Sequence, residues 1–137
     1  GDEPGREMHE TSVATKVVAA SVDEARRRGL QRVQAIRLRV GALWGVDPQS
    51  LAFHVSLLTP GTVLADATLE VAMVPIVARC RSCGMEVKDP RLDDPGFLHN
   101  LAHGMILVEA LLSCRRCGDG AVAIEQGREL DVVEVEG

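Results

Sequence analysis

Aromatic residues are almost absent from this chain. Its 137 residues include two phenylalanines, one tryptophan and no tyrosine. Proteins that bind single-stranded nucleic acid stack bases on aromatic side chains, and phosphate binding needs clustered lysine and arginine. This chain instead has a formal net charge of −5. Its composition therefore weighs against a nucleic-acid partner, and aliphatic side chains must fill the core, which a hydrophobic content of 46% allows.

Long apolar runs are absent as well. No stretch approaches the roughly 20 apolar residues that cross a bilayer, and no charged segment followed by an apolar one opens the chain. We therefore expect no membrane partner and a cytoplasmic location, where thiols stay reduced. An enzyme is the least expected class, because the chain has no cysteine outside two CxxC pairs and no HExxH motif.

The cysteines that are present form the strongest motif. All four lie in two CxxC pairs, each followed by a glycine: Cys80, Cys83 and Gly84, then Cys114, Cys117 and Gly118. Two such pairs supply four thiolates, which zinc accepts tetrahedrally, and glycine adopts the positive φ that a tight turn around a metal needs. Two disulfides or a thioredoxin-like redox pair are the alternatives, but the spacing favours zinc. A site closed by four protein ligands is structural and leaves no position for chemistry.

Four arginines flank these ligands: Arg79, Arg81, Arg115 and Arg116. Zinc with four thiolates carries a net charge of about −2. We expect the arginines to offset that charge.

Hydrophobic periodicity predicts the remaining elements. After Met8-His9-Glu10, apolar residues at intervals of three and four predict a helix that ends in Arg26-Arg27-Arg28 before Gly29. Alternation over residues 33–40 and 69–73 predicts two strands, and a helix capped by Asp47 and Pro48 lies between them. Such a strand, helix, strand unit is usually parallel. Residues 129–136 predict a third strand that joins the same sheet.

These elements predict an α+β fold. A small α/β lobe, with two helices on a three-stranded mixed sheet, would comprise residues 1–78 and 124–137, and a zinc-ribbon lobe of residues 79–123 would be inserted between two of its strands. Within the insert, residues 88–96 are expected to be a loop because prolines and a glycine interrupt them. Residues 97–103 and 105–112 are expected to form short helical turns or a strand.

Three histidines outside the MHE motif have two interpretations each. His54 lies among apolar neighbours of the predicted second helix and is expected to be a partly buried or surface residue rather than a ligand. His99 and His103 are four residues apart, which on a helix would place both imidazoles on one face, as a second metal site requires. The alternative is a pair of exposed or partner-facing histidines.

Several segments together carry a resemblance to a known family. In order these are MHE at 8–10, IRLRVGAL at 36–43, LAF at 51–53, PGT at 60–62, ATLE at 67–70, the two CxxCG pairs and GREL at 127–130. The chain resembles the HypA/HybF family of nickel-insertion accessory proteins, specifically its longer-insert members. The resemblance implies a nickel metallochaperone for maturation of [NiFe]-hydrogenase, and in some organisms urease, with a structural zinc.

The resemblance also implies a nickel site and partners. Nickel would bind the imidazole of His9 and the backbone nitrogens of Met8 and Glu10, a set that suits square-planar Ni²⁺. Seven residues precede Met8, so its nitrogen is an amide here. Glu10 would also stabilise the positive N-terminus of the helix. The implied partners are a GTPase accessory protein of nickel insertion, the hydrogenase large subunit and urease accessory proteins. The alternative function is a zinc-ribbon protein-interaction module that binds no nickel.

Overall fold

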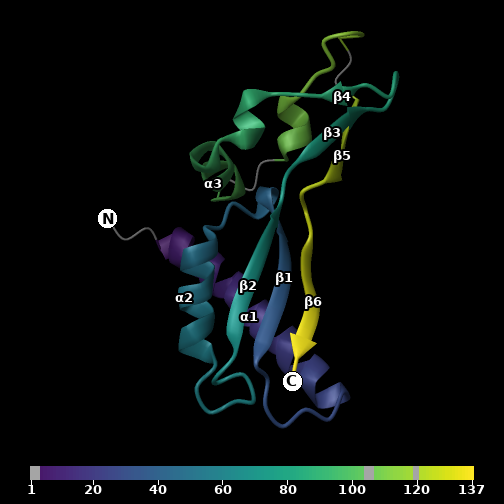
Figure 1. Cartoon of the computed structure of the whole chain (residues 1–137). Coiled ribbons are helices and arrows are strands. Elements are labelled where there is room, and N and C mark those ends of the chain that lie inside the picture. The colour runs from purple at the N-terminus through teal and green to yellow at the C-terminus, as the bar shows by residue number, and fades with distance from the viewer. Residues whose placement is uncertain (1–3, 104–106, 119–120) are drawn as a thin grey trace. The chain divides into compact units, whose positions relative to one another are not determined.

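The computed structural model describes residues 4–103, 107–118 and 121–137, with the backbone alone described for residues 4–9 and 103. Figure 1 shows the elements along the chain. The α-helices are α1 (Pro4–Arg27), α2 (Pro48–Leu58) and α3 (Pro95–His103), and short 3₁₀ helices are η1 (Ala42–Trp44), η2 (Pro90–Asp93) and η3 (Val108–Leu111). The strands are β1 (Ala35–Gly41), β2 (Thr68–Val74), β3 (Val77–Cys80), β4 (Glu86–Val87), β5 (Val122–Gln126) and β6 (Leu130–Glu136).

The chain folds into two compact units. Unit 1 comprises Gly1–Arg39, Val46–Ala72 and Leu130–Gly137, and unit 2 comprises Val40–Gly45 and Met73–Glu129. One three-stranded sheet has the order β2-β1-β6 and the other has the order β4-β3-β5. The predicted α+β fold, with a ribbon inserted into a small α/β lobe, is confirmed.

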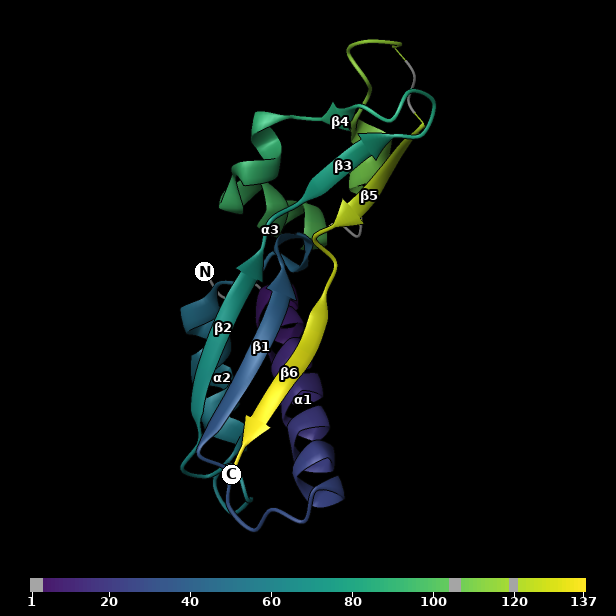
Figure 2. The same cartoon turned by 45° about the vertical axis from the view of Figure 1, so that its right-hand side comes forward.

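The first sheet is mixed, as predicted. In Figure 2 the arrows of β1 and β2 point the same way and that of β6 points the opposite way, while α1 and α2 cover one face. Alternate residues of β1, Ile36, Leu38 and Val40, are buried. On the other face Arg37 forms ion pairs with carboxylates on both neighbouring strands, at 2.8 Å from Glu70 and 2.9 Å from Glu134. The alternating pattern therefore gives one buried and one charged face.

Helix α1 begins earlier than the sequence predicted. It starts at Pro4 instead of following Glu10, so Met8, His9 and Glu10 lie inside the helix. Proline suits the first helical position because its fixed φ is helical and its missing N–H needs no partner there. The expectation that Glu10 stabilises the helix N-terminus is wrong, because that residue lies in the second turn.

The other end of α1 follows the prediction. Gly29 has a φ of +68°. Its N–H donates to the carbonyl of Arg26 at 3.1 Å, and the N–H of Leu30 donates to that of Ala25 at 2.9 Å. This is the Schellman pattern of a helix that ends in a left-handed glycine. The arginine run before it thus belongs to the helix end.

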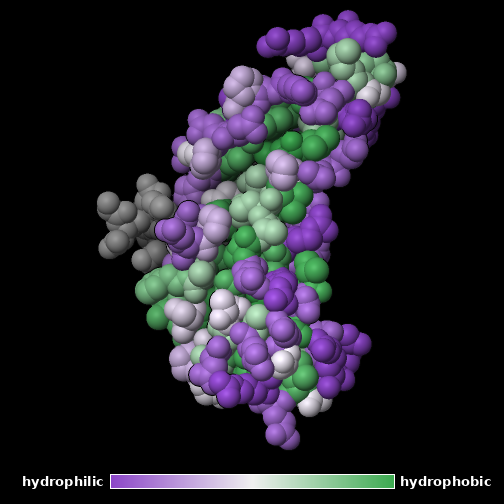
Figure 3. Space-filling view, in the orientation of Figure 1, coloured by the Kyte–Doolittle hydropathy of each residue, from purple (hydrophilic) through white to green (hydrophobic). Residues whose placement is uncertain are grey.

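Helix α2 starts as predicted at an Asp-Pro pair. The Asp47 carboxylate accepts the N–H of Ser50 at 2.9 Å, and Pro48 takes the first helical position. Its inner face buries Leu51 and Val55, whereas Phe53 and Leu57 on the outer side are 59% and 61% exposed. Figure 3 shows green surface over this helix.

Within the described residues, no helix combines the length and the apolar character needed to cross a membrane.

Unit 2 is built on the second, antiparallel sheet. Strand β3 pairs Ala78 with Val87 of β4 on one side and Cys80 with Val122 of β5 on the other. This three-stranded sheet carries its own core, to which the helical segments α3, η2 and η3 contribute. The buried members of that core are Ala78, Cys80, Val87, Leu92, Leu101, Val108, Leu112, Cys114 and Val122.

The segment between the two cysteine pairs is more helical than predicted. Residues 88–96, expected to be a loop, contain η2 and the start of α3. The reason is an Asp-Pro pair at each start. The carboxylate of Asp89 accepts the N–H of Arg91 at 2.9 Å, and that of Asp94 accepts the N–H of Gly96 at 3.0 Å. Residues 97–103 are helical, which is one of the two predicted alternatives.

Two glycines of unit 2 allow two backbone segments to approach closely. A Cβ on Gly41 would lie 2.0 Å from the carbonyl oxygen of Gly127, although the φ of −67° at Gly41 suits any residue. The N–H of Gly41 donates to the Glu129 carbonyl at 2.6 Å, and that of Leu43 donates to the Gly127 carbonyl at 3.0 Å. Only glycine at position 41 leaves room for this pairing.

Candidate metal centre

The four cysteines converge on one point in unit 2. Their sulfur atoms all lie within 4.8 Å of one another. The Sγ atoms of Cys80 and Cys117 are 3.4 Å apart, and those of Cys83 and Cys114 are 3.6 Å apart. Four sulfurs at about 2.3 Å from a tetrahedral metal are about 3.8 Å from each other. The arrangement therefore fits a four-thiolate metal site, and it is the one candidate metal cluster among the described residues.

Both cysteine pairs are held by the same turn. Gly84 has a φ of +77° and Gly118 one of +67°, as predicted for the residue after each pair. The N–H of Gly84 donates to the carbonyl of Cys80 at 2.9 Å, and the N–H of Gly118 donates to that of Cys114 at 2.8 Å. Each turn thus folds its second cysteine back toward the first.

Backbone amides favour the thiolate form at the first cysteine of each pair. Cys80 and Cys114 are buried, and Cys83 and Cys117 are exposed. The amide N–H of Cys117 donates to the Cys114 sulfur and lowers the pKa of that thiol to about 7. The amide of Cys83 likewise lowers the pKa of Cys80. Amides that stabilise thiolates in this way orient and tune metal ligands.

The flanking arginines are only partly available to the cluster. Arg79 forms an ion pair with Glu125 at 2.5 Å and donates to the carbonyl of Gly84 at 2.9 Å. The Arg79 side chain therefore stabilises the first turn by binding the backbone of that turn. The carboxylate of Glu125 offsets most of the charge on Arg79. Arg115 lines a cavity in unit 2. The expectation that all four arginines offset the charge on the metal stays a prediction.

The MHE motif lies in unit 1, in a different unit from the cysteines. Met8 and His9 are in α1, and their side chains lie outside the described atoms. Glu10 is described and is buried, with 4% of its surface exposed. Its Oε2 accepts a hydrogen bond from the hydroxyl of Ser50 on α2, and the same oxygen lies 3.8 Å from Nδ1 of His54. Nδ1 of His54 also contacts the Ser50 carbonyl oxygen at 2.8 Å.

The buried side chain of Glu10 was missed in the sequence, although a signal was present. Glu10 precedes Val13, Ala14 and Val17 by three, four and seven residues, and these three are buried. It therefore falls on the buried stripe of α1. Ser50 and His54 are four apart on α2, so they share a face. A carboxylate on a core stripe needs polar partners, and these two supply them.

The structure tests part of what the sequence predicted for the three histidines outside the MHE motif. His54 is partly buried, as expected, with 19% of its side chain exposed. Nδ1 of His99 lies 2.8 Å from the carbonyl oxygen of Gly45, so His99 joins α3 to the turn after β1 within unit 2. His103 ends α3, and its side chain lies outside the described atoms. A second metal site at His99 and His103 stays a prediction.

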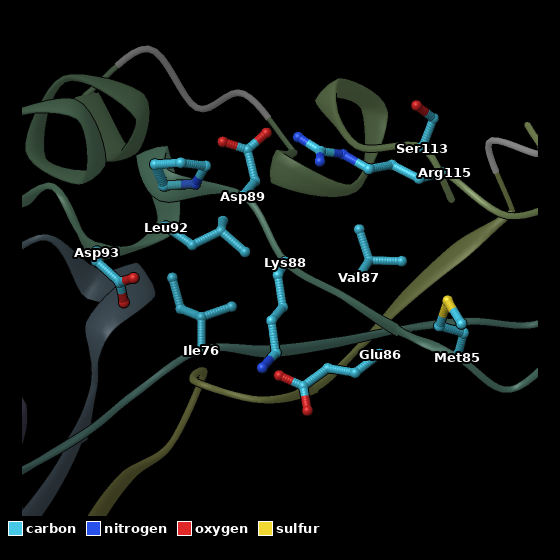
Figure 4. Close-up of a pocket in the computed structure, with 11 residues that line it drawn as sticks. Ile76, Met85, Glu86, Val87, Lys88, Asp89, Leu92, Asp93, Ser113 and Arg115 are labelled. Atoms are coloured by element: carbon cyan, nitrogen blue, oxygen red, sulfur yellow. The ribbon is translucent and has the colours of Figure 1, made fainter.

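Unit 2 also contains a cavity of about 670 Å³ beside β4 (Figure 4). Its lining combines apolar Ile76, Val87 and Leu92 with charged side chains such as Lys88 and Arg115. No histidine or cysteine lines it. The lining of the cavity therefore shares no residue with the cysteine cluster.

Comparisons with known proteins agree with this geometry. The sequence matches the family model described as "Hydrogenase/urease nickel incorporation, metallochaperone, hypA" over residues 8–137. It is 36% identical to hydrogenase maturation factor HypA of Chloroflexus aurantiacus, covering 94% of this chain and 98% of that protein. It is 35% identical to the HypA of Methanopyrus kandleri, covering 93% and 92% of the two chains.

Solved structures show the same fold. A solution structure of a HypA protein superposes with a TM-score of 0.61 at 19% identity, covering 94% of this chain and 95% of the other. The solution structure of the nickel metallochaperone HypA from Helicobacter pylori gives a TM-score of 0.60 at 17% identity, covering 93% and 95%. Sequence, fold and cysteine cluster agree, and the chain belongs to the HypA family.

Proposed function

We propose that the protein is a nickel metallochaperone that binds Ni²⁺ and delivers it during maturation of [NiFe]-hydrogenase, and of urease in organisms that have it. The observation that supports this most is the extent of the family match. It begins at Met8, the first residue of the MHE motif, and continues to the last residue. In this proposal the protein is not an enzyme, and nickel is its cargo.

The proposed nickel ligands are the imidazole of His9 and backbone nitrogens of Met8 and Glu10. Imidazole and deprotonated amide nitrogens together suit a square-planar Ni²⁺ ion. In α1 these amides are part of a helix, where successive N–H groups all point along the axis toward the preceding turn. They cannot converge on one metal in that conformation. Nickel binding thus requires the start of α1 to leave the helical conformation as far as the nitrogen of Glu10.

The proposed metal of the cysteine cluster is zinc, bound by Cys80, Cys83, Cys114 and Cys117. The two tight turns supply four thiolates at tetrahedral spacing and leave no open position, which is the arrangement of structural zinc. We propose that this ribbon, over residues 79–123, is the lobe that zinc stabilises, and that residues 1–78 with 124–137 form the nickel-binding lobe.

The proposed partners follow from the family. They are the GTPase accessory protein of nickel insertion, the hydrogenase large subunit and, where urease is served, the urease accessory proteins. A cytoplasmic location fits these partners. The acidic net charge of −5 supports neither nucleic-acid nor membrane-surface binding.

Nickel titration of His9→Ala tests the proposed function. We expect the variant to lose high-affinity nickel binding and to keep its zinc, because the cysteine cluster lies in the other unit. His103→Ala is the matched comparison, since it removes one imidazole of the alternative pair. Nickel affinity that survives His9→Ala and falls in His103→Ala would place the site at His99 and His103 instead. The absence of high-affinity nickel binding in the native chain itself would favour a zinc-ribbon interaction module that binds no nickel.

A further inference from the structure

The start of α1 contains a buried carboxylate next to the proposed nickel ligands. Among the described residues the buried polar side chains are Glu10, Ser21 and Thr59, and Glu10 is the one with an ionisable group. A buried carboxylate is costly unless hydrogen bonds compensate for its lost hydration. Here the compensation comes from a second helix, because Ser50 and His54 both belong to α2.

The contact lies at the boundary of the nickel segment. Coordination through backbone nitrogens requires α1 to uncoil as far as the nitrogen of Glu10. The side chain of the same residue is fixed to α2, and the next buried residue of α1 is Val13. Glu10 is therefore the first described residue of α1 whose side chain is held in the core of unit 1.

We infer that the Glu10 carboxylate is a positioning group, which ties α1 to α2 through Ser50 so that uncoiling for nickel stops at Glu10. This inference rests on the proposed nickel function and adds a side-chain role to a residue otherwise assigned only a backbone nitrogen. Without the contact, the uncoiled segment extends to Val13. Nickel must then order about three more residues, and the conformational entropy that they lose weakens binding by roughly tenfold or more in total.

Three variants of the full chain separate this role from direct ligation. Ser50→Ala removes the hydroxyl donor and changes none of residues 8–10. Glu10→Ala removes the carboxylate and keeps the backbone nitrogen. Glu10→Gln keeps an oxygen that can accept the Ser50 hydrogen bond. Ser56→Ala is the matched control, because Ser56 lies on the same helix, is exposed and donates only to the carbonyl of Phe53 at 2.6 Å.

Hydrogen exchange without nickel is the first readout. Amides of residues 11–14 should exchange about tenfold faster in Ser50→Ala and Glu10→Ala, whereas residues 17–25, which are held by the buried Val17 and Ala25, should be unchanged. Glu10→Gln and Ser56→Ala should stay within about threefold of the native chain. Unchanged exchange at residues 11–14 in both disrupting variants would overturn the inference.

Nickel affinity, measured by competition with a chelating dye, is the second readout. We expect Ser50→Ala and Glu10→Ala to weaken nickel binding by about tenfold or more, with Glu10→Gln and Ser56→Ala near the native value. Faster exchange with unchanged affinity would show a purely structural contact and refute the positioning role. If His9→Ala leaves nickel binding intact, the proposed function fails, while the exchange experiment still decides whether Glu10 anchors α1.

Discussion

The close approach at Gly41 makes a sharp stability prediction. The backbone of Gly41, with φ −67° and ψ 142°, has a conformation that alanine also adopts. Any loss of stability in Gly41→Ala is therefore steric. The added Cβ would lie 2.0 Å from the carbonyl oxygen of Gly127, 2.2 Å from its carbon and 2.6 Å from the nitrogen of Arg128. These are backbone atoms, which no change of rotamer can move. The two segments must separate.

Separating the two segments weakens the hydrogen bonds that join them. The bonds from Gly41 to Glu129 and from Leu43 to Gly127 would stretch or break. Each net hydrogen bond is worth about 1 kcal/mol, and overpacking adds about 1–3 kcal/mol. We expect Gly41→Ala to lower the free energy of unfolding by about 3–5 kcal/mol. Gly29→Ala is the matched control, because position 29 has open space around it and only its positive φ disfavours alanine. It should cost about 1–2 kcal/mol.

Urea unfolding with zinc present measures both variants. Trp44 is the single tryptophan, and its indole N–H donates to the Arg128 carbonyl at 3.1 Å, so its fluorescence reports the affected region. Circular dichroism follows the helices in the same samples. Midpoints are comparable when the slopes agree. If Gly41→Ala costs no more than Gly29→Ala, the close approach is not a feature of the folded protein.

Three further predictions concern metal, helix start and pH. Zinc removal, or Cys83→Ala, should unfold residues 79–123 and leave unit 1 folded, because structural zinc contributes about 10 kcal/mol or more; retained hydrogen-exchange protection at the amides of Gly84 and Gly118 after chelation would contradict this. Asp47→Ala should cost about 1 kcal/mol in urea unfolding, whereas Asp47→Asn, which still caps, should cost a few tenths. The Arg91 side chain lowers the pKa of Asp89, so this contact should stabilise the protein at neutral pH and be lost as the pH falls through the lowered pKa. The stability difference between native chain and Asp89→Asn should therefore shrink below about pH 4, and a difference independent of pH would rule the ion pair out.

Local sequence rules predicted much of unit 1. Alternation placed β1 and β2, and the Asp47-Pro48 pair placed the start of α2, because in each case a few neighbouring residues determine the local structure. The glycine after the arginine run marked the end of α1 for the same reason. Such rules depend on short-range sterics and hydrogen bonds, which are present in the sequence itself.

The segment between the cysteine pairs obeys the same local rules. Asp89-Pro90 and Asp94-Pro95 have the composition of Asp47-Pro48, and both start helical segments. The number of prolines in residues 88–96 suggested a loop, although proline at a first helical position is favourable. Position within the element mattered more than composition.

The parts that could not be predicted depend on long-range packing. Gly127 lies 86 positions after Gly41, and nothing near Gly41 in the sequence shows that the two are in contact. The contact of Glu10 with Ser50 is of the same kind, since 40 residues separate them. The cysteine cluster is the exception, because zinc chemistry links two distant motifs by their spacing and ligand type.

The helical setting of the MHE motif leads to the last prediction, which concerns a chain that begins at Met8. In the present chain α1 starts at Pro4, so the nitrogens of Met8, His9 and Glu10 lie inside a helix. A chain without residues 1–7 has an amine at Met8, and amides at the first positions of a helix have no intrahelical partner. An α-amine has a pKa near 8 and loses its proton far more readily than an amide.

The shortened chain should therefore bind nickel more tightly than the full chain. Binding no longer disrupts a helical turn, and one ligand needs no amide deprotonation. The bound ion should be yellow and diamagnetic, as square-planar Ni²⁺ is, and His9→Ala should abolish this signal in the shortened chain. Zinc content, measured in the same samples, should stay constant because the cysteine cluster belongs to unit 2. Equal affinities in the two chains, with both dependent on His9, would show that residues before Met8 supply the missing nitrogen and that the helical start of α1 yields to nickel at little cost.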